Sequence, residues 1–431
     1  MKKSVKITIS ILAVILVAVI VFDVAVIRNR PQEKEETVVS ATESTTSLED
    51  VYTDPVELQA RKIIENMTIF EKVCQMLLYY IPKEEPLEKM ERWQFGAYVL
   101  FSRNFENSTP EETRQEIAEY QKAAKIPAFI AVDEEGGGVN RVSQYSQYRS
   151  EPFPSGTRLY QNGGWQAVID DSKDKSQFLS DLGINTVLAP VADVPYSRSD
   201  YIYTRAFSTD PEAVSEYITN VVTAMNEENF ISCVKHFPGY GNNTNTHTGS
   251  SVDTRSWESF EERDLLPFKA AVEADVPFIM VSHNIIEDFD AGVPASLSKK
   301  MHDYIRQDMG FDGIIVCDGL GMSGVREYVG GDKGEVAVQA IIAGNDMICA
   351  TDVGIQARAI VDAVNEGRIK LSQIEDSVAR ILMIKIKYGL IAEGDIPNEG
   401  MIGDDSDKTT TAKAEVTDNT DYEKEQDIND Y

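Results

Sequence analysis

Residues 211–237 read PEAVSEYITNVVTAMNEENFISCVKHF, a helical pattern followed directly by an apolar strand. The first part, 211–228, repeats apolar side chains at helical spacing. The second part, 230–237, is a nearly continuous apolar run that ends with Lys235, His236 and Phe237. A strand that is apolar on both faces is typical of a parallel sheet covered by helices. A chain that repeats this unit is expected to have an α/β fold.

The same unit repeats along most of the chain. Helical patterns, such as the one at 110–124, separate further apolar runs. The strand-like runs lie at 97–102, 127–133, 185–193, 230–237, 277–283, 313–319 and 346–352. Seven visible repeats over about 330 residues predict a (β/α)8 barrel of the TIM type, with one strand not visible, rather than an open sheet.

The composition predicts one folded domain between two acidic segments. The chain has 431 residues, 42% of them hydrophobic, and a formal net charge of −30, which argues against a nucleic-acid partner. Residues 31–57 are acidic, rich in Ser and Thr and poor in large apolar side chains, which is typical of a linker. We expect a single barrel domain at 58–392 and a disordered acidic tail at 393–431.

The N-terminus predicts contact with a membrane. Three lysine residues precede an apolar run within 5–27, and two arginine residues follow it. About 20 apolar residues span a bilayer, and positive charge before the run suggests a cytoplasmic N-terminus. We therefore expect a cytoplasmic stub and transmembrane anchor at 1–30, with the catalytic domain outside the cell membrane. A cleaved signal peptide, which would release a secreted protein, is the alternative.

Polar residues cluster where the predicted strands end. They are Asp133, Asp193, Lys235 with His236, His283 and Asp318. Active sites of such barrels form at the carboxyl ends of the strands, so this clustering predicts an enzyme. Structural alternatives exist, because Asp318 could cap the following helix and the glycines after Asp133 could serve only a turn.

Charged side chains near these strand ends could bind a polar ligand. Arg141 and Arg205 offer hydrogen-bond forks, with surface ion pairs as the alternative. Lys235 and His236 follow a buried strand, where an unpaired charge would be unfavourable, and this favours a binding role. No metal or organic cofactor is predicted: phosphate-binding glycine motifs are absent, and His236 and His247 lie eleven residues apart without further metal-ligand spacing.

Several motifs resemble one known family. They are ENMTIFEKVCQM (65–76), LFSRNF (100–105), AVDEEGGGVNR (131–141), RAFSTDP (205–211), KHFPGYG (235–241), PASLS (294–298), GFDGIIVCDG (310–319), AGNDM (343–347) and VNEGRIKLSQIEDSVARILMIKIKYGL (364–390). In this order, from about residue 56 to 392, they resemble the family 3 glycoside hydrolases, specifically the single-domain bacterial β-N-acetylhexosaminidases. Relatives with a second domain take a glutamate acid/base from it, so the resemblance points to the branch that uses a loop histidine.

The resemblance implies a retaining exo-β-N-acetylglucosaminidase that hydrolyses terminal β-linked N-acetylglucosamine of cell-wall or other glycans, without a cofactor. Asp318 matches the nucleophile, which would form a covalent glycosyl-enzyme, and His247 matches the general acid/base. An unperturbed imidazole, with pKa ~6.5, suits a group that both donates and accepts protons. The positions that hydrogen-bond the terminal sugar are matched by Asp133, Arg141, Arg205, Lys235 and His236.

One residue departs from the family's pattern. Relatives usually carry Asp-x-His on the loop, whereas this chain has Asn245-Thr246-His247. Asn245 would orient the imidazole through a hydrogen bond but supplies no negative charge, so we expect a slower enzyme whose activity is shifted toward acid pH. The alternatives are a β-glucosidase, a glycoside phosphorylase of the same family, and a carbohydrate-binding protein on a weakened scaffold. Both Asp318 and His247 are present, which favours an enzyme.

Overall fold

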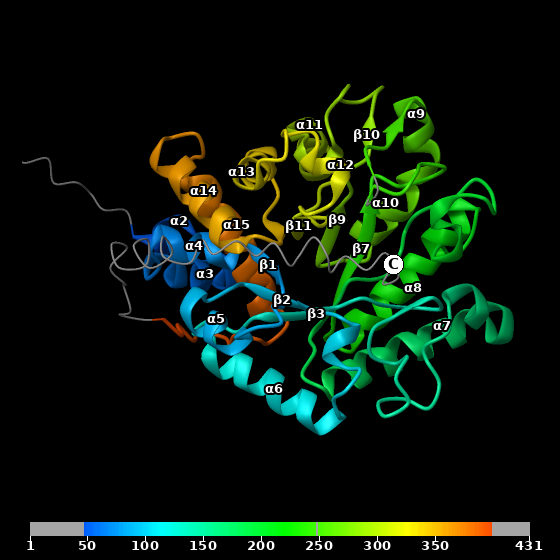
Figure 1. Cartoon of the computed structure of the whole chain (residues 1–431), viewed down its shortest axis with the longest axis horizontal. Coiled ribbons are helices and arrows are strands. Elements are labelled where there is room, and N and C mark those ends of the chain that lie inside the picture. Colours follow the sequence, from blue (N-terminus) through cyan, green and yellow to red (C-terminus); the bar gives the residue numbers. More distant parts are fainter. Residues whose placement is uncertain (1–46, 247–248, 399–431) are drawn as a thin grey trace, which may run out of the picture. The chain divides into compact units, whose positions relative to one another are not determined.

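The computed structural model describes residues 47–246 and 249–398 and folds them around a closed barrel of eight parallel strands. Around the barrel the strands follow one another in the order β1-β12-β11-β9-β7-β6-β3-β2, and the helices lie outside them (Figure 1). The barrel strands are β1 (Leu77–Tyr80), β2 (Ala97–Leu100), β3 (Phe129–Val132), β6 (Thr186–Val187), β7 (Ile231–Phe237), β9 (Phe278–Val281), β11 (Ile314–Cys317) and β12 (Met347–Ala350). The predicted (β/α)8 barrel is confirmed.

The strand that the sequence pattern did not display is β1. It begins at Leu77, one residue after the C-cap of helix α4 (Ile69–Gln75), so a single apolar run covers the end of a helix and the whole strand. The other seven strands form within the predicted runs. The shortest is β6, and an isolated parallel bridge between Val191 and Lys235 continues its pairing with β7.

Helices connect and cover the strands. Their first turns carry the capping side chains that the sequence offers, such as the reciprocal Thr68–Glu71 and Thr109–Glu112 boxes. The α-helices are α2 (Leu48–Val51), α3 (Pro55–Glu65), α4, α5 (Pro86–Trp93), α6 (Pro110–Ala123), α7 (Gly156–Ser180), α8 (Pro211–Glu227), α9 (Trp257–Ser259), α10 (Leu266–Glu273), α11 (Lys299–Asp303), α12 (Ser323–Arg326), α13 (Lys333–Ala343), α14 (Val353–Asn365) and α15 (Leu371–Lys387). Helix α8 packs against α7 and α10, α13 against α14, and α15 against α3.

Short strands and short helices lie outside the eight barrel strands. Two small sheets pair β4 (Glu134–Gly136) with β5 (Val139–Asn140) and β8 (Val252–Asp253) with β10 (Ile285–Ile286). The other short helices are η1 (Ser102–Asn104), η2 (Tyr201–Thr204), η3 (Phe260–Asp264), η4 (Ala295–Leu297) and η5 (Tyr304–Asp308). The β4–β5 hairpin follows β3 directly, so it lies at the carboxyl end of the barrel.

The described part of the domain extends beyond the predicted bounds of 58–392. Helices α2 and α3 begin inside the expected linker, because Asp54 caps α3 through a 2.7 Å bond to the Val56 amide and Pro55 fits its first turn. At the other end, the Asn398 side chain donates to the Ile63 carbonyl at 3.0 Å. The segment after 392 therefore packs on α3 as far as it is described.

Several predictions fall on residues that the structure does not describe. These are the anchor at 1–30, most of the linker, His247, and the tail from 399 onward. Within 47–246 and 249–398, none of the helices combines the length and apolar character needed to cross a bilayer.

Candidate active site

The carboxyl ends of the strands surround a pocket. Its polar wall is formed by Asp133, Arg205, Lys235, His236 and Asp318, and the remaining lining residues are Tyr80, Val99, Leu188, Met280 and Cys349. A few polar groups amid apolar walls are typical of small-molecule sites. The structure thus brings together five of the predicted site residues, although strands far apart in the sequence supply them.

Lys235 is buried in the wall of this pocket. Strand β7 carries it to the barrel interior, where its Nζ lies 2.6 Å from Asp133 Oδ1 and 2.7 Å from Glu135 Oε1. Burial would lower the pKa of Lys235, but Asp133 and Glu135 outweigh it and raise that pKa above its ordinary value. The lysine therefore stays charged, and its two carboxylate partners fix its ammonium group.

Arg205 shares one of those carboxylates. Its Nε and Nη2 form a two-pronged contact with Glu135, at 3.0 Å to Oε2 and 2.7 Å to Oε1. Burial would raise the pKa of Glu135, yet Arg205 and Lys235 together hold it well below its usual range. Glu135 is thus an ionised carboxylate between two cations.

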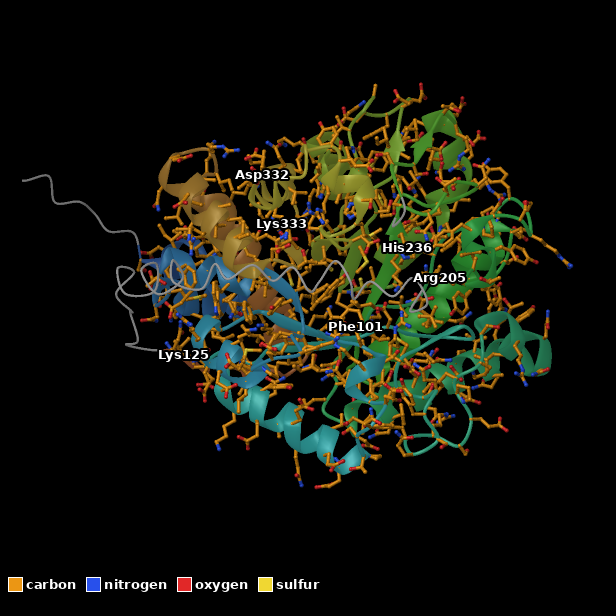
Figure 2. The ribbon with its side chains drawn as sticks, viewed as in Figure 1. Phe101, Lys125, Arg205, His236, Asp332 and Lys333 are labelled. Carbon is orange, nitrogen blue, oxygen red and sulfur yellow. The ribbon has the colours of Figure 1, made fainter. Side chains whose placement is uncertain are left out.

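His236 lies beside Arg205, as Figure 2 shows. Its Nδ1 is 2.7 Å from Asp193 Oδ2, and its Nε2 is 3.2 Å from Arg205 Nη2. The Asp193 carboxylate accepts hydrogen bonds and the guanidinium only donates them, so the ring proton belongs on Nδ1 and Nε2 accepts from Arg205. Asp193 also accepts from the backbone amides of His236, at 3.1 Å, and Tyr240, at 2.7 Å, which ties the loop after β7 to the loop after β6.

Asp318 is the half-buried carboxylate that follows β11. Its backbone amide donates to the Val281 carbonyl at 2.9 Å, and its Oδ1 accepts from the Gly319 amide at 2.8 Å. A Cβ at position 319 would come within 2.6 Å of the Tyr80 hydroxyl, so glycine at this position leaves room for the Tyr80 side chain. Asp318 lines the pocket together with Asp133, Arg205, Lys235 and His236, an arrangement suited to attack on a polar substrate.

Two other predicted site residues, Arg141 and Asn245, are not among those that line the described pocket. Arg141 is buried beyond the β4–β5 hairpin, its amide donates to Glu134 Oε2 at 2.8 Å, and it does not line the pocket as the described chain forms it. Asn245 is half-buried on the loop after β7. His247 lies outside the described residues. The roles that the resemblance gives these three residues stay predictions.

Two charged residues of the site carried no assigned role in the sequence. Glu135 was hidden in the run Asp133-Glu134-Glu135, although side chains two apart on an extended segment share a face and could have suggested it. Asp193 stood out only as a polar residue at a strand end. His283, which stood out in the same way, is fully buried and bonds Ser296 Oγ at 2.7 Å and the Gly319 carbonyl at 3.1 Å.

Comparisons of sequence identify the family. Residues 68–384 match the glycosyl hydrolase family 3 N terminal domain. The chain is 27% identical over 345 residues to Beta-hexosaminidase A of Pseudoalteromonas piscicida, a match that covers 73% of this chain and 57% of that protein. It is 30% identical over 267 residues to a Beta-hexosaminidase of Nitrosomonas eutropha, covering 59% of this chain and 72% of that one.

Solved structures agree. The fold matches a glycoside hydrolase family 3 β-N-acetylglucosaminidase from Paenibacillus sp. str. FPU-7 with a TM-score of 0.69 and 25% identity, over 80% of this chain and 68% of that chain. It also matches LpqI of M tuberculosis with a TM-score of 0.68 and 25% identity, over 77% of this chain and 96% of that chain. The predicted resemblance is therefore confirmed: the chain belongs to glycoside hydrolase family 3 and is a glycosidase related to the β-N-acetylhexosaminidases of that family.

Proposed function

We propose that this protein is a retaining exo-β-N-acetylhexosaminidase that removes terminal β-linked N-acetylglucosamine from cell-wall or other glycans. The observation that carries the proposal is the position of Asp318, which shares one pocket with Asp133, Arg205, Lys235 and His236. A pocket that brings a carboxylate together with several hydrogen-bonding groups suits a sugar, whose hydroxyl groups both donate and accept.

The reaction would proceed in two displacements. In the first, a carboxylate oxygen of Asp318 bonds to the anomeric carbon, the bond to the leaving oxygen breaks, and the His247 imidazolium protonates that oxygen. In the second, His247 takes a proton from water, the water oxygen bonds to the anomeric carbon, and Asp318 is released. Two inversions at one carbon retain the β configuration. No electron acceptor or metal takes part in either step.

Turnover of a chromogenic β-N-acetylglucosaminide tests this proposal. We expect release that disappears in Asp318→Ala, and a first-formed product that is the β anomer by proton NMR. A preference for the β-glucoside would instead support a β-glucosidase, and release that depends on inorganic phosphate would support a phosphorylase. An inactive protein that still binds N-acetylglucosamine would be a carbohydrate-binding relative.

We also propose that the apolar run within 5–27 anchors the protein in the cell membrane, with the barrel outside. The support is the sequence alone, in which lysines precede the run and arginines follow it. Fractionation of cells tests this: an anchored protein sediments with membranes and resists extraction by salt. A soluble form whose N-terminus lies beyond Arg30 would show cleavage instead.

A further inference from the structure

Glu135 contacts two charged residues of the pocket wall, Arg205 and Lys235, and is not itself among the residues that line the described pocket. Its Oε1 contacts both Lys235 Nζ and Arg205 Nη2 at 2.7 Å, and its Oε2 accepts from Arg205 Nε at 3.0 Å. Its side chain is 5% exposed. The two cations that it joins are residues that the resemblance assigns to sugar binding, whereas Glu135 itself has no assigned role.

The backbone around Glu135 is held from several directions. It belongs to β4 of the hairpin, whose turn needs the positive φ of Gly136 and Gly137. A side chain at Gly136 would collide with the carbonyl of Pro154, so the hairpin lies close against the next segment. Lys175, from α7, donates to the Glu135 carbonyl at 3.3 Å. These contacts fix the backbone, so the direction of the carboxylate does not depend on a bound ligand.

Without Glu135 the two cations would face each other. Both contact the same carboxylate oxygen, so their nitrogen atoms are a few ångström apart in a buried place, where like charges repel strongly. The negative charge of Glu135 offsets this repulsion by attracting both cations. Of the three N–H groups of Lys235, Asp133 and Glu135 use two, which leaves one for an acceptor in the pocket.

We propose that Glu135 is a positioning residue of the active site, which keeps Arg205 and Lys235 charged and directed so that their remaining donors meet the hydroxyl oxygens of the terminal sugar. This inference rests on the proposed function, because it takes the pocket to be the sugar site. Glu135 acts through its two neighbours rather than on the sugar.

The charged surroundings of Lys235 give the proposal a signature in pH. The groups that face this wall are Asp133 after β3, Asp193 after β6, Tyr201 and Arg205 at η2, His236 on β7 and Asp318 after β11. Burial would lower the pKa of Lys235, and Asp133 and Glu135 outweigh it. In Glu135→Gln the positive charge of Arg205 remains near Lys235, while one of the two carboxylates that stabilise the lysine charge is lost. Lys235 then releases its proton at a lower pH than before.

The test compares the full chain with Glu135→Gln and Glu135→Asp, on a dinitrophenyl β-N-acetylglucosaminide over a range of pH. This leaving group departs without protonation, so the alkaline limb of kcat/KM does not report the acid His247. We expect Glu135→Gln to raise KM and to lower kcat/KM by about 100-fold. The alkaline limb of kcat/KM should move to lower pH. Glu135→Asp keeps the charge, so it should recover part of the loss and leave the alkaline limb near its original place.

Asp346 offers a matched control. It is also a buried carboxylate between two cations, with Arg306 on one oxygen and Arg380 at 2.9 Å on the other, but it precedes β12 and lies at the opposite end of the barrel. Asp346→Asn should lower Tm by several degrees, as any such loss would. Its kcat/KM and pH profile should stay those of the unsubstituted chain.

The outcomes separate this inference from the proposed function. If Glu135→Gln folds and keeps kcat/KM, or loses it without a shift of the alkaline limb, the positioning role is overturned. If the unsubstituted chain hydrolyses no glycoside, the proposed function fails. The role of Glu135 is then tested by calorimetric titration of the unsubstituted chain and of Glu135→Gln with N-acetylglucosamine. Weaker binding of N-acetylglucosamine by Glu135→Gln than by the unsubstituted chain would support the positioning role of Glu135. Equal binding by the two proteins, or no binding by either, would overturn that role. Should Glu135→Gln not fold, Glu135→Asp is compared in the same way, and an unchanged KM there would overturn the inference.

Discussion

Asp193 and His236 are joined by a buried contact of 2.7 Å between Oδ2 and Nδ1. On its other side the imidazole receives a hydrogen bond from Arg205, whose Nη2 lies 3.2 Å from Nε2. The carboxylate at Nδ1 can only accept a hydrogen bond and the guanidinium at Nε2 can only donate one. Together they select the tautomer that carries its proton on Nδ1. Nε2 of His236 therefore accepts a hydrogen bond from Arg205. If Nε2 also contacts a sugar hydroxyl, it must again be the acceptor.

The tautomer of His236 is a direct prediction. With four histidines in the chain, nitrogen NMR of the imidazoles is simple to assign by comparison with a His236→Gln variant. At about pH 7 we expect the shifts of a neutral ring protonated at Nδ1. Shifts of the Nε2-protonated ring, or of the imidazolium, would contradict the donor and acceptor order of the pocket wall.

A second prediction concerns Tyr240 and Thr246. Their hydroxyl groups lie 2.6 Å apart, both residues are buried, and the Gly324 amide donates to the Thr246 carbonyl at 3.2 Å. Thr246 precedes His247 in the sequence, so removal of its partner in Tyr240→Phe should impair the step that needs a proton donor. We expect about a tenfold lower kcat/KM on substrates with a poor leaving group.

The choice of substrate supplies the control for Tyr240→Phe. A dinitrophenyl glycoside leaves without protonation, so its glycosylation step should be almost unaffected by the substitution. Thr246→Ser, which keeps a hydroxyl group at the same place, should retain most of the activity on both substrates. Equal losses on the poor and the good leaving group would mean that the contact only stabilises the fold.

Asn245 is the basis of a third prediction. Asn245→Asp would supply the negative charge that relatives carry beside the loop histidine, which favours the imidazolium and raises its pKa. We expect kcat to rise about tenfold or more, with the pH optimum moved toward neutral pH. Asn242→Asp adds the same charge at an exposed position of the same loop and should have little effect. No gain in Asn245→Asp would remove the explanation of a slower, acid-shifted enzyme.

Lys385 gives a prediction about stability. It is fully buried on α15, contacts Gln75 Oε1 at 2.8 Å and the ring of Phe129 at 5.0 Å, and burial lowers its pKa to about 7. Because the unfolded chain then holds this proton more tightly, the protein should gain stability as the pH rises from about 7 to about 10. Below that range, Lys385→Met should be more stable than the unsubstituted chain by about 2 kcal/mol, after the lost contact with Gln75 is allowed for.

Urea unfolding at several pH values checks the Lys385 prediction. The advantage of Lys385→Met should shrink as the pH rises, since the unsubstituted protein no longer has a buried charge to accommodate. Lys387→Met, at an exposed position of the same helix, should show no such dependence. A stability difference that is constant from neutral to alkaline pH would contradict the lowered pKa of Lys385.

The sequence predicted most of the barrel because buried parallel strands leave a local signal. Seven strands and their polar ends were visible as apolar runs, while β1 was masked by the helix that precedes it without a break. The contacts that make the site were not visible, because they join residues that the barrel closure alone brings together. Arg205 meets Glu135 across 70 positions of sequence, and Lys235 meets Asp133 across 102. Motif resemblance supplied roles, but it did not supply Glu135 and Asp193, the carboxylates that contact Arg205 and His236.

Asp318 is proposed to form a covalent bond with the sugar, and trapping of this glycosyl-enzyme is its most direct test. A 5-fluoro-N-acetylglucosaminyl fluoride reacts at the first step and slows the second, so the glycosyl-enzyme accumulates. Intact-mass analysis should show one added sugar per chain, and peptide sequencing should place it on Asp318. Hydrolysis of the substrate with no adduct, or with the label on another residue, would contradict the account.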